Sequence, residues 1–141
     1  MTPPRCEKAT ILLCDDIREE ADGRQSLIGV HGPTLKVARL PYTHRGLSVF
    51  VQIVNPADAF PGVQFELIAP DGSVVAEGAG ETPGASVSPG TSSVHSNYRI
   101  HLFPIRLALP GAYVARVWFD RAADVGVEAQ LMVTVDPPAV L

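Results

Sequence analysis

The sequence predicts an all-β protein, a two-sheet antiparallel β-sandwich of about eight strands. Apolar and polar residues alternate along several short segments, which is the period of a strand with one buried face. The chain has 13 Pro and 12 Gly, and most of them lie between these segments, where turns are expected. No stretch of helical length repeats its apolar residues with the helical period. A jelly roll or a small barrel is the alternative that the same pattern permits.

Length and composition indicate one globular domain. A chain of 141 residues fits a single domain, and 46% apolar with 18% charged residues is typical of a folded protein. The net charge of −4, without a basic stripe, argues against nucleic-acid binding. No apolar run is long enough to span a bilayer, and none resembles a signal peptide. We therefore expect a cytoplasmic protein, or a virion component if it is phage-derived, with Cys6 and Cys14 as free thiols.

The first third of the chain predicts a β-hairpin over residues 9–38 whose second arm is broken in two. Asp22-Gly23 is a hairpin turn signal, and Gly29 and Gly32-Pro33 interrupt the second arm. Residues 1–8 are expected to form a flexible arm that precedes a sandwich domain of residues 9–136.

The middle of the chain predicts one central strand and one tight hairpin. Residues 41–46 are expected to form a loop, and residues 47–54 a strand in mid-sheet because both of its faces are apolar. Residues 63–69 alternate cleanly, with Val63, Phe65, Leu67 and Ala69 expected to face inward. The turn residues 70–72, Pro-Asp-Gly, then lead into the next strand.

Residues 78–97 are mostly small and turn-forming, and they predict a long flap loop with room for a short edge strand near residues 86–88. Farther on, Pro104 indicates an edge position or a crossing between sheets. Two further strands are expected, the first over 112–120. The second covers 125–135 and has six alternate apolar residues facing inward. Residues 137–141 are expected to be a loose tail.

The segment from Cys14 to Glu20, followed by residues 23–30 with the sequence GRQSLIGV, resembles the start of an uncharacterised family of bacterial and phage-associated proteins. Members open with a similar acidic-arginine motif and a similar strand. Because the family has no assigned activity, the resemblance implies no catalytic residues. Separately, residues 70–72 and Pro110-Gly111-x-Tyr113 resemble turns of immunoglobulin-like domains, which implies an immunoglobulin-like architecture but no function.

The densest polar feature is an acidic cluster that begins at Asp15 and Asp16. Clustered carboxylates suit Ca²⁺, but adjacent strand residues point to opposite faces, so these two do not readily share one ion. Pairing of either carboxylate with Arg18, or with turn amides, is the favoured interpretation. Asp15, Asp16 and Arg18 are candidate interaction residues.

The histidines, at positions 31, 44, 95 and 101, lack the spacing of a metal site, and we expect surface and half-buried imidazoles. A zinc site assembled across loops is the alternative. His95, in the predicted flap, is a candidate interaction residue. No nucleophile elbow or phosphate-binding loop is present, so no catalytic residue, metal or cofactor is expected.

Trp118 and Phe50 are the aromatic residues of greatest interest. Together, on the non-core face, they could form a platform for a carbohydrate. The favoured interpretation is that Trp118 packs in the second layer of the sandwich or at a subunit contact, because large aromatic side chains are mostly well buried.

These features favour a non-enzymatic structural or assembly protein, best represented by a virion accessory of the capsid-decoration type or a bacterial counterpart. Arms at both termini and in the flap suit contacts that order on assembly. The expected partner is another protein or further copies of this chain, as a homo-oligomer or on a larger assembly. The alternative function is a β-sandwich module that binds a carbohydrate, a peptide or another protein.

Overall fold

The computed structural model describes residues 1–22, 24–80, 85–87 and 92–136. Every regular element in these residues is a β-strand, and none of them forms a helix that could cross a membrane. The twelve described strands, against about eight expected, are β1 Lys8–Glu19, β2 Gln25–Val30, β3 Thr34–Val37, β4 Tyr42–His44, β5 Leu47–Val54, β6 Val63–Ile68, β7 Val74–Gly80, β8 Ala85–Val87, β9 Val94–Leu102, β10 Ile105–Leu107, β11 Gly111–Asp120 and β12 Val125–Val135.

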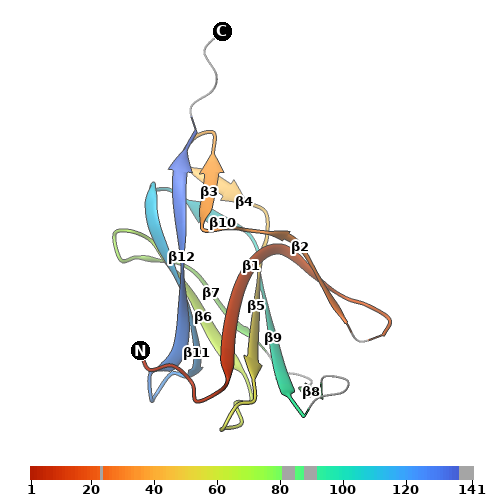
Figure 1. Cartoon of the computed structure of the whole chain (residues 1–141). Helices are drawn as coiled ribbons and strands as arrows, with labels where there is room; N and C mark the ends of the chain where they lie inside the picture. The colour runs from red at the N-terminus through yellow and green to blue at the C-terminus, as the bar shows by residue number, and fades with distance from the viewer. Residues whose placement is uncertain (23, 81–84, 88–91, 137–141) are drawn as a thin grey trace.

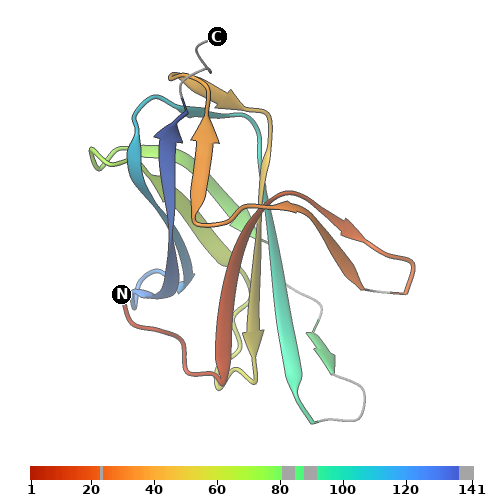
Figure 2. The ribbon, with the colours of Figure 1, turned by 45° about the horizontal axis from the view of Figure 1, so that its top comes forward.

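The strands form two large sheets and one small one. The large sheets have the orders β2-β1-β5-β9-β8 and β3-β12-β11-β6-β7, and β10 pairs with β4. Figures 1 and 2 show the two large sheets as separate layers, with β4 and β10 at one end. In the described residues neither sheet closes on itself, so the fold is a β-sandwich and not the barrel considered as an alternative.

The core lies between the two large sheets and follows the predicted alternation. In β5, the side chains of Val49, Val51 and Ile53 are fully buried, and β5 is central between β1 and β9, as predicted. The main cluster of buried residues takes side chains from both sheets, namely Leu13, Val37, Leu47, Val49, Val51, Ile53, Val63, Phe65, Leu67, Ala69, Tyr98, Ile100, Leu102, Ile105, Leu107, Tyr113, Ala115, Val117, Phe119, Leu131 and Val133.

The last strand departs from its prediction at one end. Leu131 and Val133 of β12 are buried as expected, but Val135 is 43% exposed. Val135 pairs with Val37 of the edge strand β3, at the last position of both strands. The apolar residues of β12 therefore stop being buried at the end of the sandwich. The alternation of residues in the sequence does not show where that end lies.

The predicted hairpin with a broken second arm is confirmed, but the second piece of that arm pairs in parallel with its neighbour. β1 and β2 pair antiparallel, and the second piece, β3, crosses to the other sheet. There it lies parallel to β12, so the expectation of a wholly antiparallel sandwich is wrong at this pair. The Gly32-Pro33 step redirects the chain between the sheets, and Met132 N–H donates to the carbonyl of Pro33 at 2.7 Å.

The loop expected over residues 41–46 is wrong, because Tyr42–His44 forms strand β4. This strand pairs with Ile105–Leu107, about sixty residues later in the chain. The sequence does not predict it, because three residues are too few to show the apolar–polar alternation of a strand. The crossing predicted at Pro104 is confirmed. It separates β9, in a large sheet, from β10, in the small one.

The flap expected over residues 78–97 is shorter than predicted. β7 continues to Gly80, β9 begins at Val94, and β8 is the expected short edge strand, at residues 85–87. Residues 81–84 and 88–91 lie outside the described part, as do Gly23 of the predicted turn and the tail 137–141. The Pro-Asp-Gly turn is confirmed, with Gly72 at φ +86° and its N–H donating to the carbonyl of Ala69 at 2.9 Å.

The N-terminal segment lies against the sandwich domain, at the start of β12. Thr2 bridges to Val125 in parallel, and its N–H donates to the carbonyl of Asp124 at 2.8 Å. The flexibility expected for residues 1–8 stays a prediction. Cys6 and Cys14 are free thiols, as expected.

The outer part of the first hairpin, residues 15–22 and 24–30, projects from the sandwich, and we call it the β1–β2 arm. Figures 1 and 2 show it swinging out past β5 and β9. The Arg99 guanidinium of β9 lies 3.7 Å from the Glu19 carboxylate in the arm. Because β5 lies between β1 and β9, the arm must cross over β5 to bring these groups together.

Candidate functional site

Three side chains that are distant in the sequence meet at the base of the β1–β2 arm. His31 Nε2 lies 2.8 Å from Asp15 Oδ1, and His44 Nε2 lies 3.0 Å from the same oxygen. One ligand atom from each of the three residues falls within 4.8 Å of the other two. We call this the Asp15–His31–His44 cluster.

Backbone structure explains why these three residues converge. His31 directly follows β2, where its N–H donates to the carbonyl of Leu13 at 2.7 Å, and His44 is the last residue of β4. Opposite Asp15, Gly29 has φ +64°, a left-handed conformation that glycine adopts without strain. A Cβ atom at Gly29 would stand 2.9 Å from Asp15 Cγ, so only glycine leaves room for this carboxylate.

Contacts with Tyr42 and between the two rings hold the imidazoles in place. Tyr42 Oη lies 3.1 Å from His44 Nδ1, and the rings of His31 and His44 meet edge to face with centroids 5.4 Å apart. The imidazoles also line a small apolar cavity whose other walls are Leu35, Leu47, Leu67, Ile105, Leu107 and Leu131.

The cluster is shielded on the imidazole side and open on the carboxylate side. The side chains of His31 and His44 are 16% and 17% exposed, whereas that of Asp15 is 51% exposed. A carboxylate and two imidazoles in this arrangement can form a closed hydrogen-bond network or can coordinate a transition-metal ion. Sequence reasoning missed the cluster because the contacts join β1, the end of β2 and the unpredicted strand β4.

Asp16, the neighbour of Asp15, pairs with Arg18 and with a backbone amide, as predicted. Asp16 Oδ2 accepts from Arg18 Nε at 3.2 Å, and Asp16 Oδ1 accepts from the N–H of Ile17 at 2.9 Å. Asp16 is therefore bound to its own strand while Asp15 turns to the histidines. The expectation that these adjacent carboxylates do not share one site is confirmed.

The structure does not support the alternative in which Phe50 and Trp118 form one platform. Phe50 alternates with core residues of β5, and Trp118 alternates with core residues of β11, so they face outward from different sheets. Trp118 is only 8% exposed, which confirms the expectation that it packs into the structure. Its Nε1 donates to Asp124 Oδ1 at 3.1 Å, and the Arg121 guanidinium lies 4.3 Å from the ring centroid.

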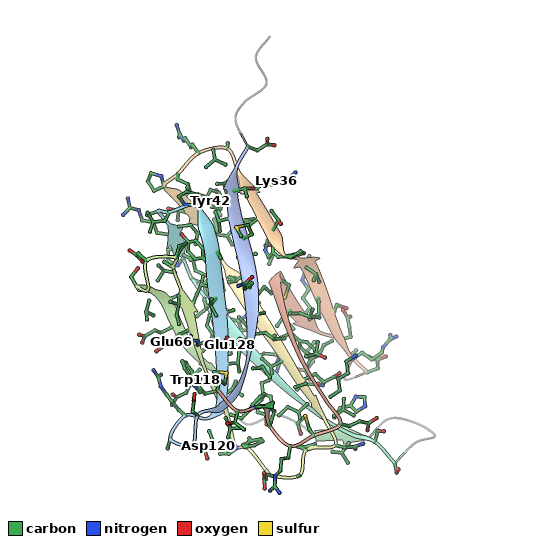
Figure 3. All side chains as sticks on the ribbon, turned by 60° about the vertical axis from the view of Figure 1, so that its left-hand side comes forward. Lys36, Tyr42, Glu66, Trp118, Asp120 and Glu128 are labelled. Atoms are coloured by element: carbon green, nitrogen blue, oxygen red, sulfur yellow. The ribbon has the colours of Figure 1, made fainter. Side chains whose placement is uncertain are left out.

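Trp118 lines a separate and larger hollow, an open depression of about 980 Å³. Its walls come from the N-terminal segment, from residues 58–64 and from the end of β11. In Figure 3, Tyr42 and Trp118 lie at opposite ends of the sandwich. The hollow and the Asp15–His31–His44 cluster are therefore separate sites.

A family model matches residues 9–127 of the chain, and its description is a family of unknown function (DUF6941). The chain belongs to this family. Comparison with curated proteins gives no match. The DUF6941 match spans the whole β1–β2 arm and all three residues of the cluster, and the expected membership of an uncharacterised family is confirmed.

The remaining histidines of the DUF6941 chain, His95 and His101, lie in strand β9. His95, expected in the flap, pairs with Val54 of β5 and with Ser86 of β8. His101 Nδ1 lies 2.8 Å from the Oγ of Ser48, a buried hydroxyl. Neither histidine belongs to the cluster.

The thiol of Cys14 is buried next to the Asp15–His31–His44 cluster. Its Sγ donates to the carbonyl of Ser48 at 3.6 Å, and the residue is fully buried. Burial raises the pKa of the Cys14 thiol, and the nearby carboxylates of Asp15 and Asp16 raise it further. Cys14 is therefore held as an uncharged thiol, which behaves as a small apolar side chain.

Proposed function

We propose that this protein is a non-enzymatic structural or assembly protein that contacts a second copy of itself through the β1–β2 arm. The observation that supports this proposal is the edge position of β2. Among the described residues β2 pairs only with β1, so the other side of its backbone is available to a further strand. Ile28 and Val30 of this strand are 39% and 50% exposed.

The composition of β2 also favours a strand-to-strand contact. Soluble proteins commonly protect an exposed edge with charged residues, and the edge strands of the other sheet carry Lys36 in β3 and Glu77 in β7. Residues 25–30 carry no charge. An edge of this kind accepts a strand from a partner, with main-chain hydrogen bonds for affinity and alternate side chains for specificity.

The proposed setting is a larger assembly, best represented by a virion to which the protein adds as an accessory of the capsid-decoration type, or a bacterial counterpart. The resemblance to phage-associated proteins, over Cys14–Glu20 and residues 23–30, falls on the β1–β2 arm itself. The arm is therefore the segment that both arguments select. The proposed location is the cytoplasm, or the virion if the protein is phage-derived.

Size-exclusion chromatography with light scattering tests self-association. The wild-type protein should show a mass above the 15.0 kDa of one chain at micromolar concentration. Val30→Lys should return it to a monomer, because a lysine on the edge strand has to be desolvated in the contact. Val74→Lys is the matched control, since Val74 is a similarly exposed valine on the edge strand β7 of the other sheet. A wild-type protein that stays monomeric, or an equal effect of both variants, would count against the proposal.

We also propose that the sandwich is immunoglobulin-like. The neighbours β1-β5-β9 in one sheet and β6-β11-β12 in the other support this, since they follow the A-B-E and C-F-G orders of that fold. Tyr113, near the start of β11, donates its Oη to the carbonyl of Leu109 at 2.7 Å. A tyrosine that binds backbone a few residues upstream, in this strand, is the tyrosine corner of immunoglobulin-like domains.

The second candidate function is a binding module for a carbohydrate, a peptide or another protein, and the hollow beside Trp118 favours it. Trp118 is the single tryptophan of the chain, so its fluorescence reports directly on that hollow. Titration with a panel of oligosaccharides and peptides should change the emission if the hollow binds one of them. Unchanged emission across the panel, together with concentration-dependent mass, favours the assembly function.

A further inference from the structure

We propose that Asp15, His31 and His44 form a binding site for a divalent transition-metal ion, with Zn²⁺ as the expected ion. The ligands are one carboxylate oxygen of Asp15 and the Nε2 atoms of the two histidines. This site is independent of the assembly function proposed above.

The donor set selects the class of ion. Imidazole nitrogen suits zinc, copper, iron and nickel, whereas calcium and magnesium prefer sites made only of oxygen. Two histidines and one carboxylate are three protein ligands, which leaves a fourth position of a tetrahedral ion for solvent or another ligand. The half-exposed side chain of Asp15 leaves the carboxylate side of the cluster open to such a ligand.

Two of the three separations between the ligand atoms are close to what an ion requires, and the nitrogen–nitrogen separation is at most 4.8 Å. Metal–ligand bonds of about 2.0–2.2 Å place the ligand atoms of a tetrahedral zinc site about 3.3 Å apart. The two nitrogen–oxygen separations are 2.8 and 3.0 Å, so each must open by only a few tenths of an ångström. Both separations share Asp15 Oδ1, so the Nε2 atoms of both imidazoles already lie beside the same carboxylate oxygen.

Tyr42 supports the tautomer that metal binding needs. Coordination through Nε2 leaves the proton of a neutral imidazole on Nδ1, and metal-binding histidines usually donate that proton to a neighbouring group. Tyr42 Oη lies 3.1 Å from His44 Nδ1 and can accept this hydrogen bond. In the metal-free cluster the same hydroxyl can instead donate to Nδ1 while Nε2–H donates to Asp15.

The surroundings strengthen the site. Six apolar side chains wall the cavity behind the imidazoles, and a low-dielectric wall increases the attraction between the ion and the carboxylate. The ligands come from β1, from the residue after β2 and from β4. A bound ion would thus fasten the base of the β1–β2 arm to the small sheet of β4 and β10.

Isothermal titration of the metal-free full chain with ZnCl₂ tests the site, and the absorption spectrum of a Co²⁺ titration reports the ligands. The wild-type chain should bind one Zn²⁺ per chain, and Co²⁺ should give the intense visible bands of a tetrahedral site. Asp15→Asn, His31→Gln and His44→Gln should each weaken zinc binding by more than the roughly 10–100-fold expected when an outer-sphere partner is lost. Tyr42→Phe, which removes such a partner, should weaken binding by about 10-fold.

Asp16→Asn and His95→Gln are the matched controls, since they remove the same groups outside the cluster. They should bind zinc as the wild type does. Circular dichroism of each metal-free variant checks that it is folded. The proposal is overturned if the folded wild type shows no saturable zinc binding, or if the three ligand variants bind as tightly as the controls.

Discussion

Tyr113 joins the start of β11 to the turn before it. Its ring is fully buried, and its Oη donates to the carbonyl of Leu109 at 2.7 Å while accepting from the N–H of the same residue at 3.3 Å. Tyr113→Phe keeps the ring but leaves both backbone groups without this partner. We expect the free energy of unfolding to fall by about 1–2 kcal/mol, measured by urea denaturation. An unchanged midpoint would show that water replaces the hydroxyl at no cost.

Asp124 makes stability depend on pH at the other end of the molecule. The hydrogen bond from Trp118 Nε1, followed by the amino terminus at 3.2 Å, holds the pKa of the Asp124 carboxyl below its usual 3.8. A lowered pKa stabilises the fold above the unfolded value, and this stabilisation is lost as the pH falls through the folded pKa.

Asp124→Asn should therefore lower the unfolding midpoint at pH 7 and have a progressively smaller effect below pH 3.8. The substitution is a fair comparison because Asp124 has φ +53°, a conformation that asparagine also tolerates. Urea titrations of both proteins across this pH range measure the difference. A difference that stays constant from pH 7 to below pH 3 would contradict this assignment.

At the residue scale, sequence alternation identified the buried positions well and the cluster not at all. The inward prediction for Val63, Phe65 and Leu67 is confirmed, since each is nearly fully buried. Burial of this kind depends on local period alone. The meeting of Asp15 with His31 and His44 depends on where two later segments return in space, and no local pattern records that.

At the scale of elements, β7 packs closely against β9. A Cβ atom at Gly78 would lie 2.7 Å from side-chain atoms of Ile100 and of Leu102. Gly78→Ala should therefore destabilise the fold by about 1–3 kcal/mol, as overpacking of a core does. Gly32→Ala is the control, because a Cβ there meets nothing within 4 Å, and it should leave the thermal midpoint nearly unchanged. Equal midpoints for the two variants would contradict the close approach.

The long strands were predictable, but the short strand β4 and the parallel pairing of the short strand β3 were not. The strands over 47–54 and 63–69 carry enough residues to show a period, and the structure contains both. β4 has three residues, and β3 has four and pairs in parallel with β12. Both strands depend on partners that are distant in the sequence, so local alternation identifies neither β4 itself nor the strand with which β3 pairs.

At the scale of the whole molecule, the sandwich supplies a rigid base and the β1–β2 arm supplies a projecting edge. The arm is connected to the base through Asp15 and its two histidines and through the ion pair of Arg99 with Glu19. The sequence predicted the sandwich and the hairpin of the arm. The direction in which the arm projects depends on the left-handed Gly29 and on the crossing over β5, which are tertiary features.

Amide hydrogen exchange as a function of protein concentration tests the proposed role of the arm most directly. If β2 pairs with a second copy, peptides that cover residues 25–30 should exchange more slowly at high than at low protein concentration. Peptides from the edge strand β7 should show no such change, and Val30→Lys should abolish the change in β2. Equal exchange of β2 at all concentrations would contradict the account.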